Sequence, residues 1–134
     1  MKEMQNKFGM VGLGVMGRNL LLNIADQGYS VSGLDKEPLA ISFLQKEANN
    51  QEIFATQSTV DFVKSLAQPR AIMILVPAGN PVDMVVADLL PNLDPGDIII
   101  DGGNSYFLDT KSRTEALKEN GIHFMGVGIS GGEQ

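Results

Sequence analysis

Three glycines near the N-terminus of this 134-residue chain have the spacing G-x-G-x-x-G, within the run Gly12–Gly17. In a strand–turn–helix unit, the first glycine permits the tight turn, the second lets the backbone approach a pyrophosphate, and the third lets helix and strand pack closely. The unpaired N–H groups of the helix N-terminus then face the phosphates. The apolar run Phe8–Val11 before the glycines and the amphipathic segment Val15–Gln27 after them supply that context. The spacing therefore predicts a dinucleotide phosphate site, and a P-loop is disfavoured because no Lys-Ser or Lys-Thr pair follows.

A second candidate is Asp35, which ends the apolar run Tyr29–Leu34, 35 − 14 = 21 residues beyond the middle glycine. At this distance an acidic residue accepts hydrogen bonds from the adenosine ribose hydroxyls. A solvated turn carboxylate is the alternative interpretation. A carboxylate here repels the 2′-phosphate of NADP by roughly 1–4 kcal/mol at about 4 Å, and the Lys36 ammonium could offset part of that repulsion. The sequence thus favours NAD and leaves NADP open.

Two further glycine-rich stretches, Asp101–Ser105 and Ser130–Gly132, follow apolar runs near the C-terminus. Ligands of open parallel sheets bind outside the carboxyl ends of the strands, and Asn104 and Ser130 offer neutral groups for an amide, hydroxyl or carboxylate. For Asn104 the alternative is a turn residue in the left-handed conformation, and Ser105 is expected to be the N-cap of the helix that follows. The single histidine, His123, starts the last expected strand, at the opposite end from such a crevice. We therefore expect His123 to have a structural role or to lie on the surface.

The elements that must position these residues follow from short apolar runs that alternate with amphipathic segments. The expected strands are Phe8–Val11, Tyr29–Leu34, Ile53–Ala55, Ala71–Val76, Ile98–Ile100 and Ile122–Val127. The expected helices are Val15–Gln27, Pro38–Asn49, Ser58–Leu66, Val82–Leu90 and Ser105–Glu119. With right-handed crossovers they predict an α/β, Rossmann-type doubly wound parallel sheet of six strands in the order 3-2-1-4-5-6, with helices on both faces.

The length suits one domain over residues 1–134, with residues 1–6 as a flexible tail. The chain ends at Gly131–Gln134, directly after the last expected strand and without a closing helix, which we interpret as the boundary of a domain in a longer protein. Hydrophobic residues make up 43% and charged residues 19%, as in ordinary globular proteins.

Composition excludes several other classes of site. A net charge of −6 argues against a nucleic-acid partner, which requires clustered Lys and Arg. Without cysteine there is no disulfide or thiolate nucleophile, and one histidine makes a metal site improbable. Residues 1–7 are polar, unlike a signal peptide, and the apolar runs are too short to cross a membrane. We expect a cytoplasmic protein.

Three motifs together resemble the 6-phosphogluconate dehydrogenase family: GLGVMG at Gly12–Gly17, IIIDGGNS at Ile98–Ser105 and GVGISGGE at Gly126–Glu133. The first motif is shared with the wider β-hydroxyacid dehydrogenase superfamily, whereas DGGN combined with SGGE is more specific. The resemblance implies the N-terminal coenzyme domain of an enzyme of the pentose phosphate pathway. Such an enzyme passes hydride from C3 of 6-phosphogluconate to the nicotinamide and releases CO2 without a metal, giving ribulose 5-phosphate.

The resemblance also implies a set of binding residues. The dinucleotide would be bound by Gly12, Gly14, Val15, Met16, Gly17, Asp35, Lys36, Glu37, Val76, Pro77, Ala78 and Asn104. The substrate would be bound by Asn104, Ser130, Gly131 and Gly132.

The sequence departs from the family pattern in two places, at residues 35–37 and at residue 77. NADP-dependent members commonly have Asn-Arg-Thr where this chain has Asp35, Lys36 and Glu37. Losing the guanidinium removes a bidentate phosphate clamp, so the coenzyme is expected to be NADP or NAD, with Asp35 favouring NAD. Pro77 stands where many members have lysine, which removes a charge and a backbone donor.

The family's general base lysine and general acid glutamate lie in a later, mostly helical portion. No catalytic residue is therefore expected within residues 1–134, and the chain alone should bind coenzyme without turnover. The full-length protein is expected to be a homodimer. Two alternatives stay open: another β-hydroxyacid dehydrogenase of the hydroxyisobutyrate type, and a non-catalytic NAD(P)-sensing module with the same fold. DGGN and SGGE argue against both.

Overall fold

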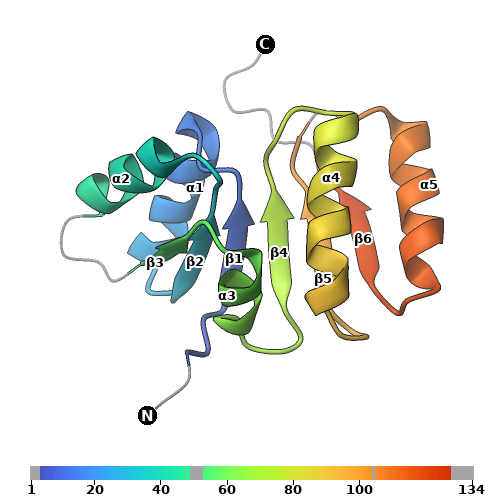
Figure 1. The fold of residues 1–134 in the computed structure, drawn as a ribbon, viewed down its shortest axis with the longest axis horizontal. Coiled ribbons are helices and arrows are strands. Elements are labelled where there is room, and N and C mark those ends of the chain that lie inside the picture. Colours follow the sequence, from blue (N-terminus) through green and yellow to red (C-terminus); the bar gives the residue numbers. More distant parts are fainter. Residues whose placement is uncertain (1–3, 49–52, 104, 128–134) are drawn as a thin grey trace.

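Six parallel strands form a single sheet in the order β3-β2-β1-β4-β5-β6, as predicted (Figure 1). The structure, a computed structural model, describes residues 4–48, 53–103 and 105–127. The strands are β1 (Phe8–Val11), β2 (Val31–Leu34), β3 (Phe54–Thr56), β4 (Ala71–Ile74), β5 (Ile98–Asp101) and β6 (His123–Gly126). Because the chain starts in the middle of the sheet and builds outward in both directions, β1 and β4 are neighbours although they are distant in sequence.

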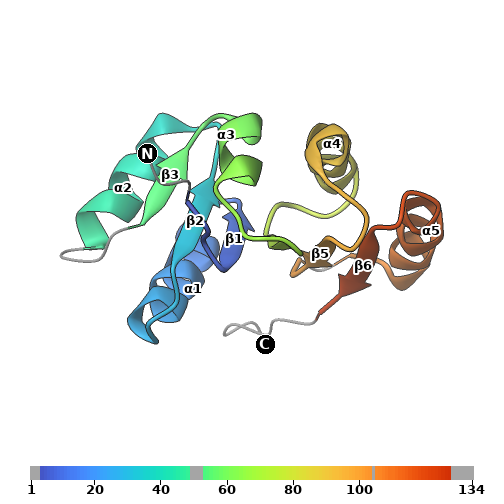
Figure 2. The same ribbon diagram turned by 90° about the horizontal axis from the view of Figure 1, so that it is seen from below.

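The helices cover both faces of the sheet (Figure 2). They are α1 (Val15–Asp26), α2 (Pro38–Glu47), α3 (Thr59–Lys64), α4 (Asn80–Leu89) and α5 (Phe107–Lys118), and a 3₁₀ turn, Leu90–Asn92, extends α4. Residues of α1 and α2 pack into one apolar core, and residues of α3, α4 and α5 pack into the other. The doubly wound class predicted from the sequence is thereby confirmed.

Strand β4 shows why the central strands are apolar throughout. Ile72 and Ile74 are fully buried in the core beneath α3 and α4, whereas Met73 and Leu75 pack against the core beneath α1. Successive side chains of a strand point to opposite faces, so a strand covered on both sides needs apolar residues at every position.

Two local expectations need correction. The backbone N–H of Asn6 donates to the Ser65 carbonyl, and its side chain donates to Ser32 Oγ at 2.8 Å. Asn6 is therefore part of the folded domain and not of the flexible tail expected over residues 1–6. The second correction concerns Ser105, because α5 begins after Tyr106 without a side-chain cap. The Ser105 hydroxyl instead donates to the carboxylate of Asp101, a stronger acceptor than a neutral oxygen.

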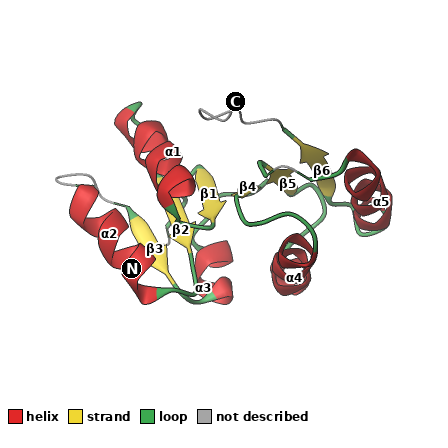
Figure 3. Ribbon diagram, turned by 90° about the horizontal axis from the view of Figure 1, so that it is seen from above, coloured by secondary structure: helices red, strands yellow, loops and turns green. Residues whose placement is uncertain are grey.

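The carboxyl ends of β1 and β4 meet at the upper edge of the sheet in Figure 1, and Figure 3 looks onto this edge. The loops that follow β1, β2, β4 and β5 all leave the sheet here, since the strands are parallel. At this edge α1 lies on one side of the sheet and α4 on the other. Within the described ranges, no helix is long and apolar enough to cross a membrane.

Candidate coenzyme-binding site

Two of the three motif glycines are required by the fold itself. Gly12 has a φ of 100°, in the region that favours glycine, and a Cβ there would lie closer than 3.0 Å to the Leu75 carbonyl oxygen. A Cβ on Gly17 would lie equally close to the Gly12 carbonyl oxygen. The turn after β1 and the packing of α1 on that turn therefore explain these two glycines without a ligand.

Gly14 is different, because nothing in the protein requires a glycine there. Its φ of −66° and ψ of −173° suit any residue, and a Cβ would meet no atom within 4 Å. Gly14 is also the N-cap of α1, and no side chain caps this helix terminus. Open space in front of uncapped N–H groups is what an anion such as a pyrophosphate needs. Gly14 thus fits the role of admitting a phosphate close to the backbone.

The carboxylate of Asp35 is held by two backbone donors. Its Oδ2 accepts the N–H of Leu13 at 2.7 Å, and its Oδ1 accepts the N–H of Glu37 at 2.9 Å. The half-buried carboxylate thereby joins the glycine-rich loop to the end of β2, which is more than a solvated turn residue would do. Each carboxylate oxygen has a further lone pair, so the side chain can still accept a hydrogen bond from a ribose hydroxyl.

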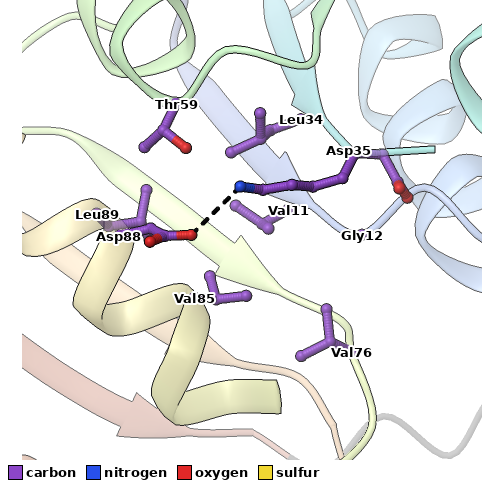
Figure 4. A pocket seen from close by; sticks show the side chains of 10 residues that line it. Val11, Gly12, Leu34, Asp35, Thr59, Val76, Val85, Asp88 and Leu89 are labelled. Atoms are coloured by element: carbon purple, nitrogen blue, oxygen red, sulfur yellow. Dashed lines mark hydrogen bonds and ion pairs between the residues drawn. The ribbon is translucent and has the colours of Figure 1, made fainter. Parts of the chain in front are cut away.

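A cleft of about 110 Å³ opens beside Asp35, between the ends of β1 and β2 on one side and α3 and α4 on the other (Figure 4). It is lined by Val11, Gly12, Leu34, Asp35, Lys36, Thr59, Val76, Val85, Asp88 and Leu89. Sites for whole drug-sized ligands reach about 300–1,000 Å³, so this cleft holds only one ring system of a larger ligand. Its aliphatic walls suit the faces of an aromatic base.

An ion pair spans the cleft between β2 and α4. Lys36 Nζ lies 3.5 Å from Asp88 Oδ2 on the opposite wall (Figure 4). The side chains are 75% and 53% exposed, so solvent weakens the pair. Asp88 was not among the residues predicted from the sequence, since no motif marks it. Glu37, which was predicted, does not line the cleft, because its carboxylate caps α2 by accepting the Leu39 N–H.

The loop between β4 and α4 is fixed from α5 by Arg113, another residue that no motif marked. Its Nε donates to Asp83 Oδ1 at 2.7 Å, and its Nη2 donates to the Gly79 carbonyl at 3.3 Å. The hydrogen bond from Arg113 lowers the pKa of Asp83, and the same bond raises the pKa of Arg113. Three of the predicted residues come directly before Gly79. Of these, Val76 lines the cleft, whereas Pro77 and Ala78 are exposed beyond β4.

The motif after β5 is organised by a buried carboxylate. Asp101 accepts the N–H of Gly103 at 2.9 Å and the hydroxyl of Ser105, which holds the loop at the carboxyl edge. The predicted ligand-binding residues Asn104, Ser130, Gly131 and Gly132 lie outside the described residues. Of the motif residues expected at the pyrophosphate, Val15 and Met16 are exposed beside Gly14.

His123 lies away from this edge of the sheet. His123 is exposed at the start of β6, and its N–H donates to the Asp97 carbonyl at the opposite end of the sheet, as the sequence predicted. Among the described residues, no group of three or more His, Cys, Asp or Glu side chains could hold a metal ion.

Fold and site together define the class of a dinucleotide-binding α/β domain, with a glycine-rich loop after β1 and a small apolar cleft between β2 and α4. A family model described as the NAD binding domain of 6-phosphogluconate dehydrogenase matches residues 7–134. The chain therefore belongs to this family, as its motifs predicted.

Known proteins agree with this assignment. The chain is 52% identical over 132 residues to a decarboxylating 6-phosphogluconate dehydrogenase of Chlamydia pneumoniae, covering 98% of this chain and 28% of the relative. It is 44% identical to an NADP(+)-dependent, decarboxylating 6-phosphogluconate dehydrogenase of Bacillus subtilis, covering 97% of this chain and 28% of the relative. A solved 6-phosphogluconate dehydrogenase of Plasmodium falciparum superposes with a TM-score of 0.85 at 31% identity, over 90% of this chain and 27% of that one.

Proposed function

We propose that this chain is the coenzyme domain of a decarboxylating 6-phosphogluconate dehydrogenase and binds NAD(P) at the carboxyl edge of β1, β2 and β4. The whole protein would oxidise 6-phosphogluconate to ribulose 5-phosphate and CO2, with the coenzyme accepting the hydride. The chain spans just over a quarter of the relatives named above, and those relatives carry this activity in their names. We also propose that the whole protein is a homodimer located in the cytoplasm.

The described residues suggest how the coenzyme would lie. The adenine would enter the apolar cleft between Leu34 and Val85, and Asp35 would accept hydrogen bonds from the adjoining ribose. The pyrophosphate would then lie over Gly14 at the start of α1. From there the nicotinamide would extend past Val76 toward the loop that Asp101 holds. Pro77, Ala78 and Asn104 would complete its site, and Ser130, Gly131 and Gly132 would bind the substrate.

The observation that carries the proposal is the open space at Gly14. Gly14→Ala adds a methyl group that the protein can accommodate, because nothing lies within 4 Å of it. The melting temperature of the variant should therefore match that of the unsubstituted chain. The added methyl would occupy the approach of the pyrophosphate, so we expect coenzyme affinity to fall at least about tenfold.

Gly17→Ala is the contrasting variant, because its methyl would clash with the Gly12 carbonyl oxygen. It should lower the melting temperature whether or not coenzyme is present. Calorimetric titration and thermal unfolding of both variants make the comparison. Normal coenzyme affinity in a folded Gly14→Ala chain would exclude phosphate binding at this loop.

The structure favours NAD as the tighter ligand of this chain. Asp35 is fixed by two backbone donors and cannot swing away from a 2′-phosphate without losing them. The Bacillus relative is by name NADP(+)-dependent, so a preference for NAD would distinguish the present sequence from that relative. Separate titrations with NAD and NADP at low salt test it, and tighter NADP binding would overturn it.

A further inference from the structure

The carboxylate of Asp88, on the last turn of α4, forms the wall of the cleft opposite Asp35 (Figure 4). We propose that Asp88 is a specificity-determining residue, which holds the Lys36 ammonium across the cleft and so keeps it from a 2′-phosphate. The assignment rests on the proposed coenzyme function of this site. It adds a residue on a different element, 52 positions away from Lys36 in the sequence.

The backbone around Lys36 directs its side chain over the cleft. On one side of it, Asp35 is bonded to Leu13 and to Glu37, and the Lys36 carbonyl accepts the side-chain amide of Gln57 at 2.9 Å. With the backbone held in this way, the lysine side chain extends from the end of β2 to α4, where it meets Asp88. The ammonium is thus placed at the α4 wall and not beside the Asp35 carboxylate.

The charges of the cleft explain why this placement affects coenzyme choice. Among the described residues that line it, Lys36 is the one cation, and Asp35 and Asp88 are the two anions. A phosphate monoester carries about −1.5 to −2 charges at neutral pH. NADP would therefore face Asp35 with the only nearby cation already paired, whereas NAD brings no charge to this position. Asp88 disfavours NADP twice, by its own charge and by occupying Lys36.

Removing the carboxylate should relieve both effects. Asp88→Asn keeps the shape of the side chain, removes one negative charge and frees Lys36 for the phosphate. We expect the affinity for NADP relative to NAD to rise about three- to tenfold, the range for one exposed charge interaction. NAD affinity itself should change less than about twofold, because NAD has no 2′-phosphate.

A double-mutant cycle with Lys36→Met separates the two effects. With Asp88 present, Lys36→Met should change NADP affinity little, since the ammonium is already paired. In the Asp88→Asn background the same change should remove most of the gain. Glu115→Gln, which neutralises an exposed carboxylate on α5 away from the cleft, is the matched control for net charge and should leave the ratio unchanged.

The experiment is calorimetric titration of the 134-residue chain and these variants with NAD and with NADP at low salt, with circular dichroism to verify folding. An unchanged ratio in folded Asp88→Asn would overturn the assignment. An equal rise with and without Lys36 would show that Asp88 acts by its charge alone and would overturn the role of Lys36. If neither coenzyme binds the unsubstituted chain, the proposed function itself fails, and this result is distinct from the other two.

Discussion

Replacing Asp35 by asparagine tests whether one carboxylate both discriminates between NAD and NADP and holds the glycine-rich loop in place. Asparagine keeps one acceptor oxygen, which can still accept the Leu13 N–H. The amide nitrogen then faces the Glu37 N–H, which loses its partner. An unsatisfied N–H costs about 1–3 kcal/mol when it is buried. The hydrogen bond between the Glu37 N–H and Asp35 is exposed to solvent, so we expect the unfolding free energy to fall by only about 1 kcal/mol.

The effect on coenzyme binding should be larger than the effect on stability and should differ between the two coenzymes. Hydrogen bonds to a charged group contribute about 1.5–3 kcal/mol, so NAD affinity should fall roughly 10- to 100-fold. For NADP, the loss of the carboxylate also removes a repulsion of roughly 1–4 kcal/mol at about 4 Å. NADP affinity should therefore stay level or rise. The preference for NAD should fall by at least about tenfold.

The assay is a pair of titrations with NAD and NADP, with chemical unfolding of the same samples. Glu37→Gln is a close control, because it removes the same charge two residues away while its side chain caps α2 and does not line the cleft. If Asp35→Asn and Glu37→Gln change the coenzyme ratio equally, the effect is one of net charge and the ribose assignment is wrong. If neither changes it, Asp35 only holds the loop.

Three further predictions concern stability and turnover. Asp97 is almost fully buried and accepts the N–H groups of Arg70 and Asp94 and the Arg70 guanidinium, so Asp97→Ala should lower the unfolding free energy by about 3–5 kcal/mol in urea titrations. Because the pKa of Asp83 is lowered below 3.8 in the folded state, its ion pair with Arg113 stabilises the fold above that pH and is lost as the pH falls through the folded pKa. The stability difference between the unsubstituted chain and Arg113→Met, about 1 kcal/mol or less after solvent screening, should therefore shrink between about pH 6 and about pH 3. Finally, the purified 134-residue chain should bind coenzyme without substrate-dependent NAD(P)H formation. Any such formation, followed by the absorbance of reduced nicotinamide, would place catalytic groups within this chain.

The sequence predicted the topology and the tight glycine-rich turn after β1 because both depend on local patterns. The apolar run of β4 and the glycine spacing each lie within a few consecutive residues, and the structure confirms the fold they predict. At Gly12 and Gly17 the backbone leaves no room for a side chain, so a glycine at these positions already indicates a tight turn and close helix packing. The position of Asp35 beside the glycine-rich loop could be predicted for the same reason, because one helix and one strand set the number of residues between them.

Asp88 and Arg113 could not be predicted, because their roles depend on how α4 packs against β2 and α5. Lys36 and Asp88 are 52 residues apart, and Arg113 and Asp83 are 30 apart, with no motif that relates them. The incorrect prediction for Ser105 has a similar cause. A serine before a helix usually caps it, but here the carboxylate of Asp101 lies within reach of the hydroxyl and accepts a hydrogen bond from it.

The two hydrogen bonds of Asp35 imply that coenzyme preference and loop geometry are coupled at this residue. A substitution that removes the carboxylate to admit a 2′-phosphate also weakens or removes the hydrogen bonds from the Leu13 and Glu37 N–H groups, and so loosens the loop that would hold the pyrophosphate. Gains in phosphate recognition at Asp35 are therefore partly cancelled by a looser phosphate loop. Among the described residues, the hydrogen-bond partners of Asp35 are Leu13 and Glu37, and Asp88 is paired with Lys36, so substitution of Asp88 should move the preference while the loop keeps its geometry. Asp88→Asn with Asp35 intact should therefore gain NADP affinity with a smaller loss of NAD affinity than any single change at Asp35.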